Sequence, residues 1–172
     1  VLMTKLKFPD ISSALSNSNL SEEVKQYLPL LKLGLPSNLD AWDGYPAERD
    51  RVFSLFKNNN SKLISLAGDT HNAWFSKLFN NAEEHIGYEF GTPSVTSPGL
   101  SEYLNGVNPG ELEQGIINAN KEIKWVNTSH RGYTKIYLNE SILKGTFKFI
   151  ESVLEKSAEI SFSKTFTIDP KS

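Results

Sequence analysis

Four consecutive residues, Gly68-Asp69-Thr70-His71, combine side chains that can bind a metal ion with a residue that permits a sharp turn. Carboxylate oxygens and neutral imidazole nitrogens are common metal ligands, and Gly68 lets the backbone turn so that Asp69 and His71 converge. The apolar run at residues 62–67 directly before them is typical of a buried strand. Open α/β sheets commonly present ligands at the carboxyl ends of such strands. We therefore expect a site in this loop.

Taken alone, this Gly-Asp-x-His pattern is short enough to recur by chance. An Asp at the end of a strand is also often only a turn or capping residue. Two unusual strings that flank the pattern at moderate spacing, residues 42–46 and 91–99, strengthen the metal-site interpretation.

The elements that would position this loop alternate between helix and strand. Pro46 suits the first turn of a helix with an apolar face, which residues 58–60 should end. Beyond the loop we expect strands at 74–79 and 86–90, an irregular loop at 91–99 that lines a site, and a helix at 109–120. A short helix over 21–31, capped by Ser21, would precede them all. This order predicts an α/β fold.

The rest of the chain favours antiparallel strands. Residues 133–138, 146–152 and 160–168 alternate partly with period two and are joined by short turns, so we expect a β-meander packed as one layer of a larger structure. Residues 1–8 are typical of a strand entered partway, and we expect further sequence upstream of Val1.

Several strings, taken in order, resemble the PhoD-like alkaline phosphatases over roughly residues 1 to 140. They are Trp-Asp-Gly-Tyr-Pro-Ala-Glu-Arg (42–49), Gly-Asp-Thr-His-Asn-Ala-Trp (68–74), Gly-Thr-Pro-Ser-Val-Thr-Ser-Pro-Gly (91–99) and Arg-Gly-Tyr (131–133). The resemblance implies a calcineurin-like metallophosphoesterase fold, with two packed β-sheets flanked by helices. It also implies hydrolysis of phosphate mono- or diesters at a multinuclear centre of iron and calcium ions, in a periplasmic or secreted enzyme.

Carried over to this chain, the family pattern makes His71 a metal ligand and Asp69 either a ligand or the group that orients the histidine. Trp42, Asp43 and Tyr45 become candidates for substrate contact or for support of the residues around the metal. Asn72 is a candidate for contact with a phosphate or a water, and Arg49 is expected to pair with a carboxylate. His85 and His130 are expected to have surface or structural roles.

The motifs that supply most metal ligands in this family, rich in Asp, Asn and His, have no counterpart in residues 1–40, where Asp10 and Asp40 are the only Asp residues and no His occurs. A two-metal site needs several ligands for each ion, together with bridging groups. We therefore interpret residues 1–172 as the C-terminal portion of one phosphoesterase domain, a partial α/β sandwich with antiparallel C-terminal strands that contributes part of the metal site. We expect this chain to be inactive by itself.

Composition narrows the remaining function classes. A formal net charge of -2 with scattered Lys and Arg disfavours nucleic-acid binding, and no apolar run is long enough to span a membrane. The absence of Cys excludes disulfides and a cysteine nucleophile from this segment. Ser94, Ser97 and Ser101 lack the surroundings of a serine nucleophile. The alternative that stays open is a β-rich module that binds carbohydrate or protein, and the oligomeric state is left undetermined.

Overall fold

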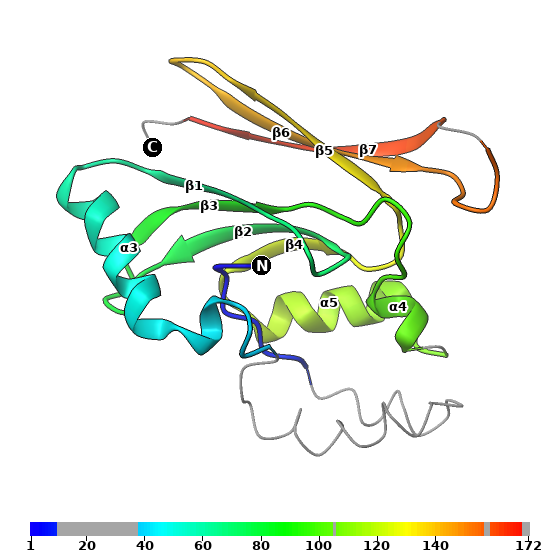
Figure 1. The fold of residues 1–172 in the computed structure, drawn as a ribbon, viewed down its shortest axis with the longest axis horizontal. Helices are drawn as coiled ribbons and strands as arrows, with labels where there is room; N and C mark the ends of the chain where they lie inside the picture. Colours follow the sequence, from blue (N-terminus) through cyan, green and yellow to red (C-terminus); the bar gives the residue numbers. More distant parts are fainter. Residues whose placement is uncertain (10–37, 105, 157–158, 170–172) are drawn as a thin grey trace.

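The computed structural model describes residues 1–9, 38–104, 106–156 and 159–169. Two β-sheets pack face to face, and the main helices lie on the outer side of the larger sheet (Figure 1). The strands of the larger sheet, in the order β1-β3-β2-β4, are β1 (Leu63–Ala67), β2 (Ala73–Phe79), β3 (His85–Gly91) and β4 (Ile123–Asn127). Those of the smaller sheet, in the order β5-β6-β7, are β5 (Gly132–Leu138), β6 (Leu143–Ile150) and β7 (Ile160–Ile168). The expected partial α/β sandwich and its C-terminal meander are confirmed.

The helices start where the sequence places helix-initiating residues. Helix α3 (Pro46–Asn58) has Pro at its first position and follows the short 3-10 turn η1 (Trp42–Gly44). Helix α5 (Pro109–Ala119) is capped by Asn108, whose side-chain oxygen accepts hydrogen bonds from the backbone N–H groups of Gly110 and Glu111. A third helix, α4 (Leu100–Tyr103), occupies a single turn after the irregular loop.

Strand directions bring the ends of three strands to one edge of the larger sheet. Strand β1 pairs in parallel with β3, and β2 is antiparallel to both β3 and β4. Strands β1, β3 and β4 therefore run the same way, and their carboxyl ends meet at the same edge. The loops that follow these strands, residues 68–72, 92–99 and 128–131, are consequently neighbours.

Aromatic side chains fill the space between the sheets. Phe75 and Phe90 of the larger sheet pack against Phe147, Phe149 and neighbouring residues of the smaller one. The opposite face of the larger sheet is covered by apolar residues of α5 and α3, which form two further clusters. Both faces of the inner strands β2 and β3 are thus buried, whereas Leu66 of the edge strand β1 is 63% exposed.

The expectation of a strand at residues 1–8 is wrong. These residues form no strand, because their backbone N–H groups bond to side chains instead of to a neighbouring strand. The N–H groups of residues 3–7 donate to the side chains of Glu89 (from Met3 and Thr4), Glu122 (from Lys5), Asp43 (from Leu6) and Asn120 (from Lys7), over distances of 2.7–3.0 Å. This segment is therefore held beneath the larger sheet by acidic and amide side chains.

Two further differences concern the element assignments. Strand β4 was not expected from the sequence, although Trp125 and Val126 pair with Phe75 and Trp74 of β2. The helix expected over 21–31 lies outside the described residues. Within the described ranges, none of the helices has the length and apolar character needed to cross a membrane.

Candidate functional site

The Gly68–His71 loop is bonded to the other loops at the carboxyl edge of the larger sheet. The amide oxygen of Asn72 accepts a hydrogen bond from Leu100 N at 2.9 Å, and Ser101 N donates to Thr128 O at 3.3 Å. Gly132 N donates to Ser94 O at 3.0 Å. The loops after β1, β3 and β4 therefore form one connected unit, referred to below as the carboxyl-edge loops (residues 68–72, 92–101 and 128–132).

His71 lies in this unit with one ring nitrogen engaged. Its Nδ1 is 3.1 Å from the carbonyl oxygen of Pro98. A carbonyl oxygen can only accept, so Nδ1 carries the proton and donates it. In the neutral ring, Nε2 then has its lone pair free, and no other described residue bonds to it. A histidine held by an Nδ1–H to carbonyl bond is the arrangement that commonly orients metal-binding imidazoles.

Asp69 lies two residues before it and is exposed. No described residue forms a hydrogen bond or ion pair with its carboxylate. Both Asp69 and His71 have positive φ angles, 74° and 60°, in the left-handed region that non-glycine residues rarely adopt. Such residues cost roughly 1–3 kcal/mol each and cluster at functional sites. The loop therefore presents two unengaged ligand atoms from a strained backbone.

Asn72 and Trp74 support the loop from below. Asn72 is buried, and its amide nitrogen donates to Thr70 O at 2.5 Å while its oxygen accepts from Leu100 N. The indole N–H of Trp74 donates to the Thr70 hydroxyl at 2.7 Å. Because the amide groups of Asn72 are taken up in this way, the side chain fixes the loop rather than pointing at solvent.

The residues of the Trp42–Tyr45 turn contact the N-terminal segment. Trp42 packs beside the cluster that contains Met3 and Phe53, and its backbone N–H donates to Leu2 O at 3.4 Å. Asp43 accepts the Leu6 N–H at 3.0 Å, and Tyr45 is 57% exposed. No hydrogen bond joins this turn to residues 68–72 within the described part of the chain. Substrate contact by these residues stays a prediction.

The loop carries two side chains of metal-ligating type, Asp69 and His71. An exposed carboxylate suits hard ions such as calcium, and a free imidazole nitrogen suits ions such as iron. Across the described residues, no group of three or more His, Cys, Asp or Glu side chains is placed to hold an ion. These observations support Asp69 and His71 as a partial ligand set.

His130 lies in the loop after β4 but is differently placed. Its ring packs edge-on against Phe162, with the centroids 4.8 Å apart, and Nδ1 lies 3.0–3.2 Å from polar atoms of Asn127 and Ser129. Partial burial lowers the pKa of His130, and the nearby Glu113 acts in the opposite direction. This ring packs at the end of the smaller sheet, which agrees with the structural role expected for it.

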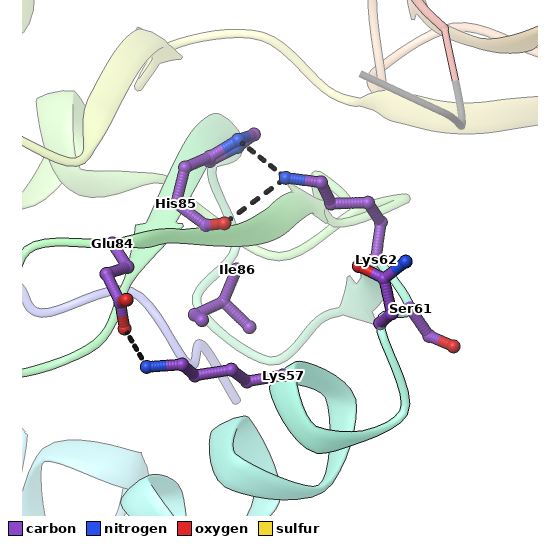
Figure 2. Close-up of a pocket in the computed structure, with 7 residues that line it drawn as sticks. Lys57, Ser61, Lys62, Glu84, His85 and Ile86 are labelled. Carbon is purple, nitrogen blue, oxygen red and sulfur yellow. Dashed lines mark hydrogen bonds and ion pairs between the residues drawn. The ribbon is translucent and has the colours of Figure 1, made fainter.

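A cavity of about 600 Å³ lies at the opposite edge of the larger sheet, where β1 and β3 begin (Figure 2). Figure 2 shows Lys57 paired with Glu84, and Lys62 directed at His85. His85 Nε2 lies 3.0 Å from Gly87 O and donates to it, so Nδ1 is the acceptor for Lys62 Nζ at 3.4 Å. Burial and the adjacent Lys62 lower the pKa of His85. Both ring nitrogens are engaged, so His85 is unsuited to bind a metal.

At the carboxyl-edge loops, two residues were not identified from the sequence as site residues. They are Glu102, which bonds to Gly99 N, and Arg131, which pairs with Glu102. Arg131 was noted only as part of a recognisable string. Glu102 follows Gly99 by three residues, which is the spacing of a capping box. That spacing is visible in the sequence, but it indicates only a local cap. It does not indicate that the capped peptide, Pro98–Gly99, also bonds to His71.

Comparison with known proteins was consistent with these features. Residues 2–147 match the family model described as PhoD-like phosphatase. Alkaline phosphatase D of Bacillus subtilis (strain 168) is 32% identical over 134 residues, which cover 75% of this chain and 22% of that protein. The chain thus spans under a quarter of the length of this relative. No solved structure matches. Because the family model covers most of the chain, the protein belongs to the PhoD-like phosphatase family.

Proposed function

We propose that this chain supplies Asp69 and His71 to the metal site of an enzyme that hydrolyses phosphate mono- or diesters. The observation that carries this proposal is the free Nε2 of His71, set by the bond from Nδ1 to Pro98 O, in a loop where Asp69 also has a free carboxylate. Family membership supports the reaction class. It also favours a phosphatase over the alternative of a carbohydrate- or protein-binding module.

Metal ions held by Asp69 and His71, calcium and iron in our proposal, would supply positive charge to activate water and to stabilise charge on the phosphoryl oxygens. The contribution of the chain itself is geometric. Pro98 O holds the imidazole in one tautomer, and Asn72 ties the loop to the start of α4. These contacts fix the imidazole of His71 before an ion binds, which reduces the entropy lost on binding.

We further propose that the chain alone lacks the full ligand set and has no substantial phosphatase activity. Two ligands on one loop cannot hold two ions with their bridging groups. The remaining ligands would come from outside the described residues, and export of the enzyme to the periplasm or beyond the cell stays a prediction by resemblance.

Metal binding and turnover test this proposal separately. Equilibrium binding of calcium and of iron to the 172-residue chain should weaken at least tenfold in His71→Ala and in Asp69→Asn. The matched control is His85→Gln, whose ring nitrogens are already engaged, and it should bind as the unmodified chain does. Unchanged affinity in His71→Ala would exclude the proposed metal site. Substantial turnover of an aryl phosphodiester by the chain alone, abolished by His71→Ala, would exclude the partial-site interpretation.

A further inference from the structure

The carbonyl group that holds His71 belongs to the same peptide unit as an N–H held by a carboxylate. Pro98 O accepts from His71 Nδ1 at 3.1 Å, and Gly99 N–H, at the other end of that peptide, donates to Glu102 Oε2 at 2.7 Å. A peptide unit is planar, so fixing its N–H also fixes the direction of its carbonyl. The carboxylate of Glu102 therefore determines where the acceptor for His71 points.

Glu102 is itself anchored. Arg131, which is 7% exposed, donates from Nη2 to Glu102 Oε2 and from Nη1 to Ser129 O at 3.1 Å. The Glu102 side chain is 49% exposed, so this ion pair contributes less energy than a fully buried one. Its main effect is directional, because it draws the carboxylate to the loop after β4.

The backbone of Glu102 adds a second restraint. Its N–H donates to the backbone oxygen of Gly99 at 3.2 Å, while its side chain accepts from the Gly99 N–H, which is the one half of a capping box that a glycine N-cap allows. The next N–H groups of this helix are also occupied, Leu100 N by Asn72 Oδ1 and Ser101 N by Thr128 O. The start of α4 is thus fully bonded and serves to position the Pro98–Gly99 peptide rather than to bind an anion.

We propose that Glu102, anchored by Arg131, is a positioning residue for His71 and acts through the Pro98–Gly99 peptide to keep Nδ1 protonated and Nε2 free. In many metal sites a carboxylate bonds directly to the ligating imidazole, whereas here a peptide unit lies between the two groups. The negative charge polarises this peptide, and hydrogen bonds in such a chain strengthen one another by about 10–30% each. The inference rests on the proposed function for the role of Nε2, but the preference of His71 for one tautomer holds without a metal.

The direct test is the tautomer of His71 in the metal-free chain. Imidazole ¹⁵N chemical shifts, measured at about pH 9 where an ordinary histidine is neutral, report which nitrogen carries the proton. We expect Nδ1–H to dominate in the unmodified chain. Glu102→Ala should move the population towards Nε2–H, the form that free histidine prefers. Glu102→Gln, which keeps an acceptor for Gly99 N–H, should retain most of the Nδ1–H form.

Controls separate this role from general stabilisation. Glu111→Ala removes an exposed carboxylate from the first turn of α5 and should leave the tautomer unchanged. Glu102→Met keeps the length of the side chain without an acceptor and should reproduce the effect of Glu102→Ala, so the test survives if the Ala variant misfolds. An identical tautomer population in the unmodified chain and in the Met variant would overturn the proposal.

Metal affinity distinguishes this inference from the proposed function. If Glu102 positions His71, Glu102→Ala should weaken metal binding by about tenfold, the lower end of the range for residues that support metal ligands. A tautomer shift in Glu102→Ala, with metal binding insensitive to His71→Ala, would support the positioning role and exclude the metal site. Metal binding that depends on His71, with no tautomer shift in either Glu102 variant, would exclude the positioning role alone.

Discussion

Arg49 offers the sharpest test of how the N-terminal segment is held under the larger sheet. This side chain is 1% exposed, and its Nη2 lies 3.0 and 3.2 Å from the two carboxylate oxygens of Glu122. Its Nε also donates to Met3 O at 2.5 Å, and its guanidinium lies 4.3 Å from the centre of the Phe53 ring. The expected pairing of Arg49 with a carboxylate is therefore confirmed.

Arg49→Met should destabilise the chain by about 3–5 kcal/mol, the usual cost of removing one partner of a buried ion pair. Met retains the packing on Phe53, so the loss comes from the unpaired carboxylate and from the unsatisfied Met3 O. Glu122 keeps hydrogen bonds from Lys5 N at 2.8 Å and Phe79 N at 3.4 Å, which favours the lower half of that range. Urea unfolding, followed by its midpoint and slope, measures this difference.

The pH dependence has a definite sign. Burial raises the pKa of Glu122 above its value in the unfolded chain, although the adjacent Arg49 acts to lower it. The folded state then binds more protons, so stability falls as pH rises from about 4.5, the ordinary carboxyl value, through the raised pKa. Removing Arg49 raises this pKa further. The cost of Arg49→Met should therefore be smaller at pH 5 than at pH 8.

Two variants complete the experiment. In Arg49→Met with Glu122→Gln, the uncompensated charge is gone and Gln can still accept from Lys5 N–H, so the double variant should be more stable than Arg49→Met alone at pH 8. Arg51→Met, on the same helix, removes an exposed pair with Glu48 and should cost less than about 1 kcal/mol. A cost below that value for Arg49→Met, or one that does not change with pH, would refute the buried-pair account.

Three further changes test other parts of the fold. Gly145→Ala should lower the free energy of unfolding, measured in urea, by about 1–3 kcal/mol. The added Cβ would lie 2.1 Å from the ring of Phe90 on the other sheet. An unchanged free energy of unfolding would mean that the sheets can separate locally. In thermal unfolding, the Asp69→Gly variant should be more stable than the Asp69→Ala variant by about 1 kcal/mol, since of the two only Ala is strained at φ 74°. Equal stability of the two variants would mean that the loop relaxes. The pKa of His130 is lower in the folded chain, so below pH 6.5 the unfolded chain binds more protons and the free energy of unfolding falls as pH falls. His130→Gln should make that fall smaller. An unchanged dependence of stability on pH would contradict this prediction.

The candidate site was predictable to the extent that it depends on local pattern. The apolar run before Gly68 predicts a strand followed by a polar loop, which is where Asp69 and His71 lie, but the expected burial is not met: β1 is an edge strand in which only Leu63 is buried. The periodic helices and the C-terminal meander also follow from spacing alone. Each of these features depends on neighbours within a few residues.

The N-terminal segment was mispredicted for the opposite reason. Residues 1–8 have a composition compatible with a strand, but their N–H groups bond to Glu89 and Glu122, more than 80 residues away along the chain. A pattern of apolar and polar residues does not distinguish a ladder of strand hydrogen bonds from bonds to distant side chains. The same holds for β4, which pairs with β2 although β3, α4 and α5 lie between the two strands in sequence.

The strained backbone of the loop at Asp69 and His71 is held in place by contacts from the other carboxyl-edge loops. Left-handed residues such as Asp69 and His71 persist only where surrounding contacts determine their conformation. Those contacts, from Pro98 O and Leu100 N to the side chains of His71 and Asn72, all lie within this chain. The ring of His71 and the amide of Asn72 are thus fixed by contacts within the described residues. Under the proposed function, the remaining ligands would then meet a loop that is already in place, and completing the site would require docking rather than refolding of the carboxyl-edge loops.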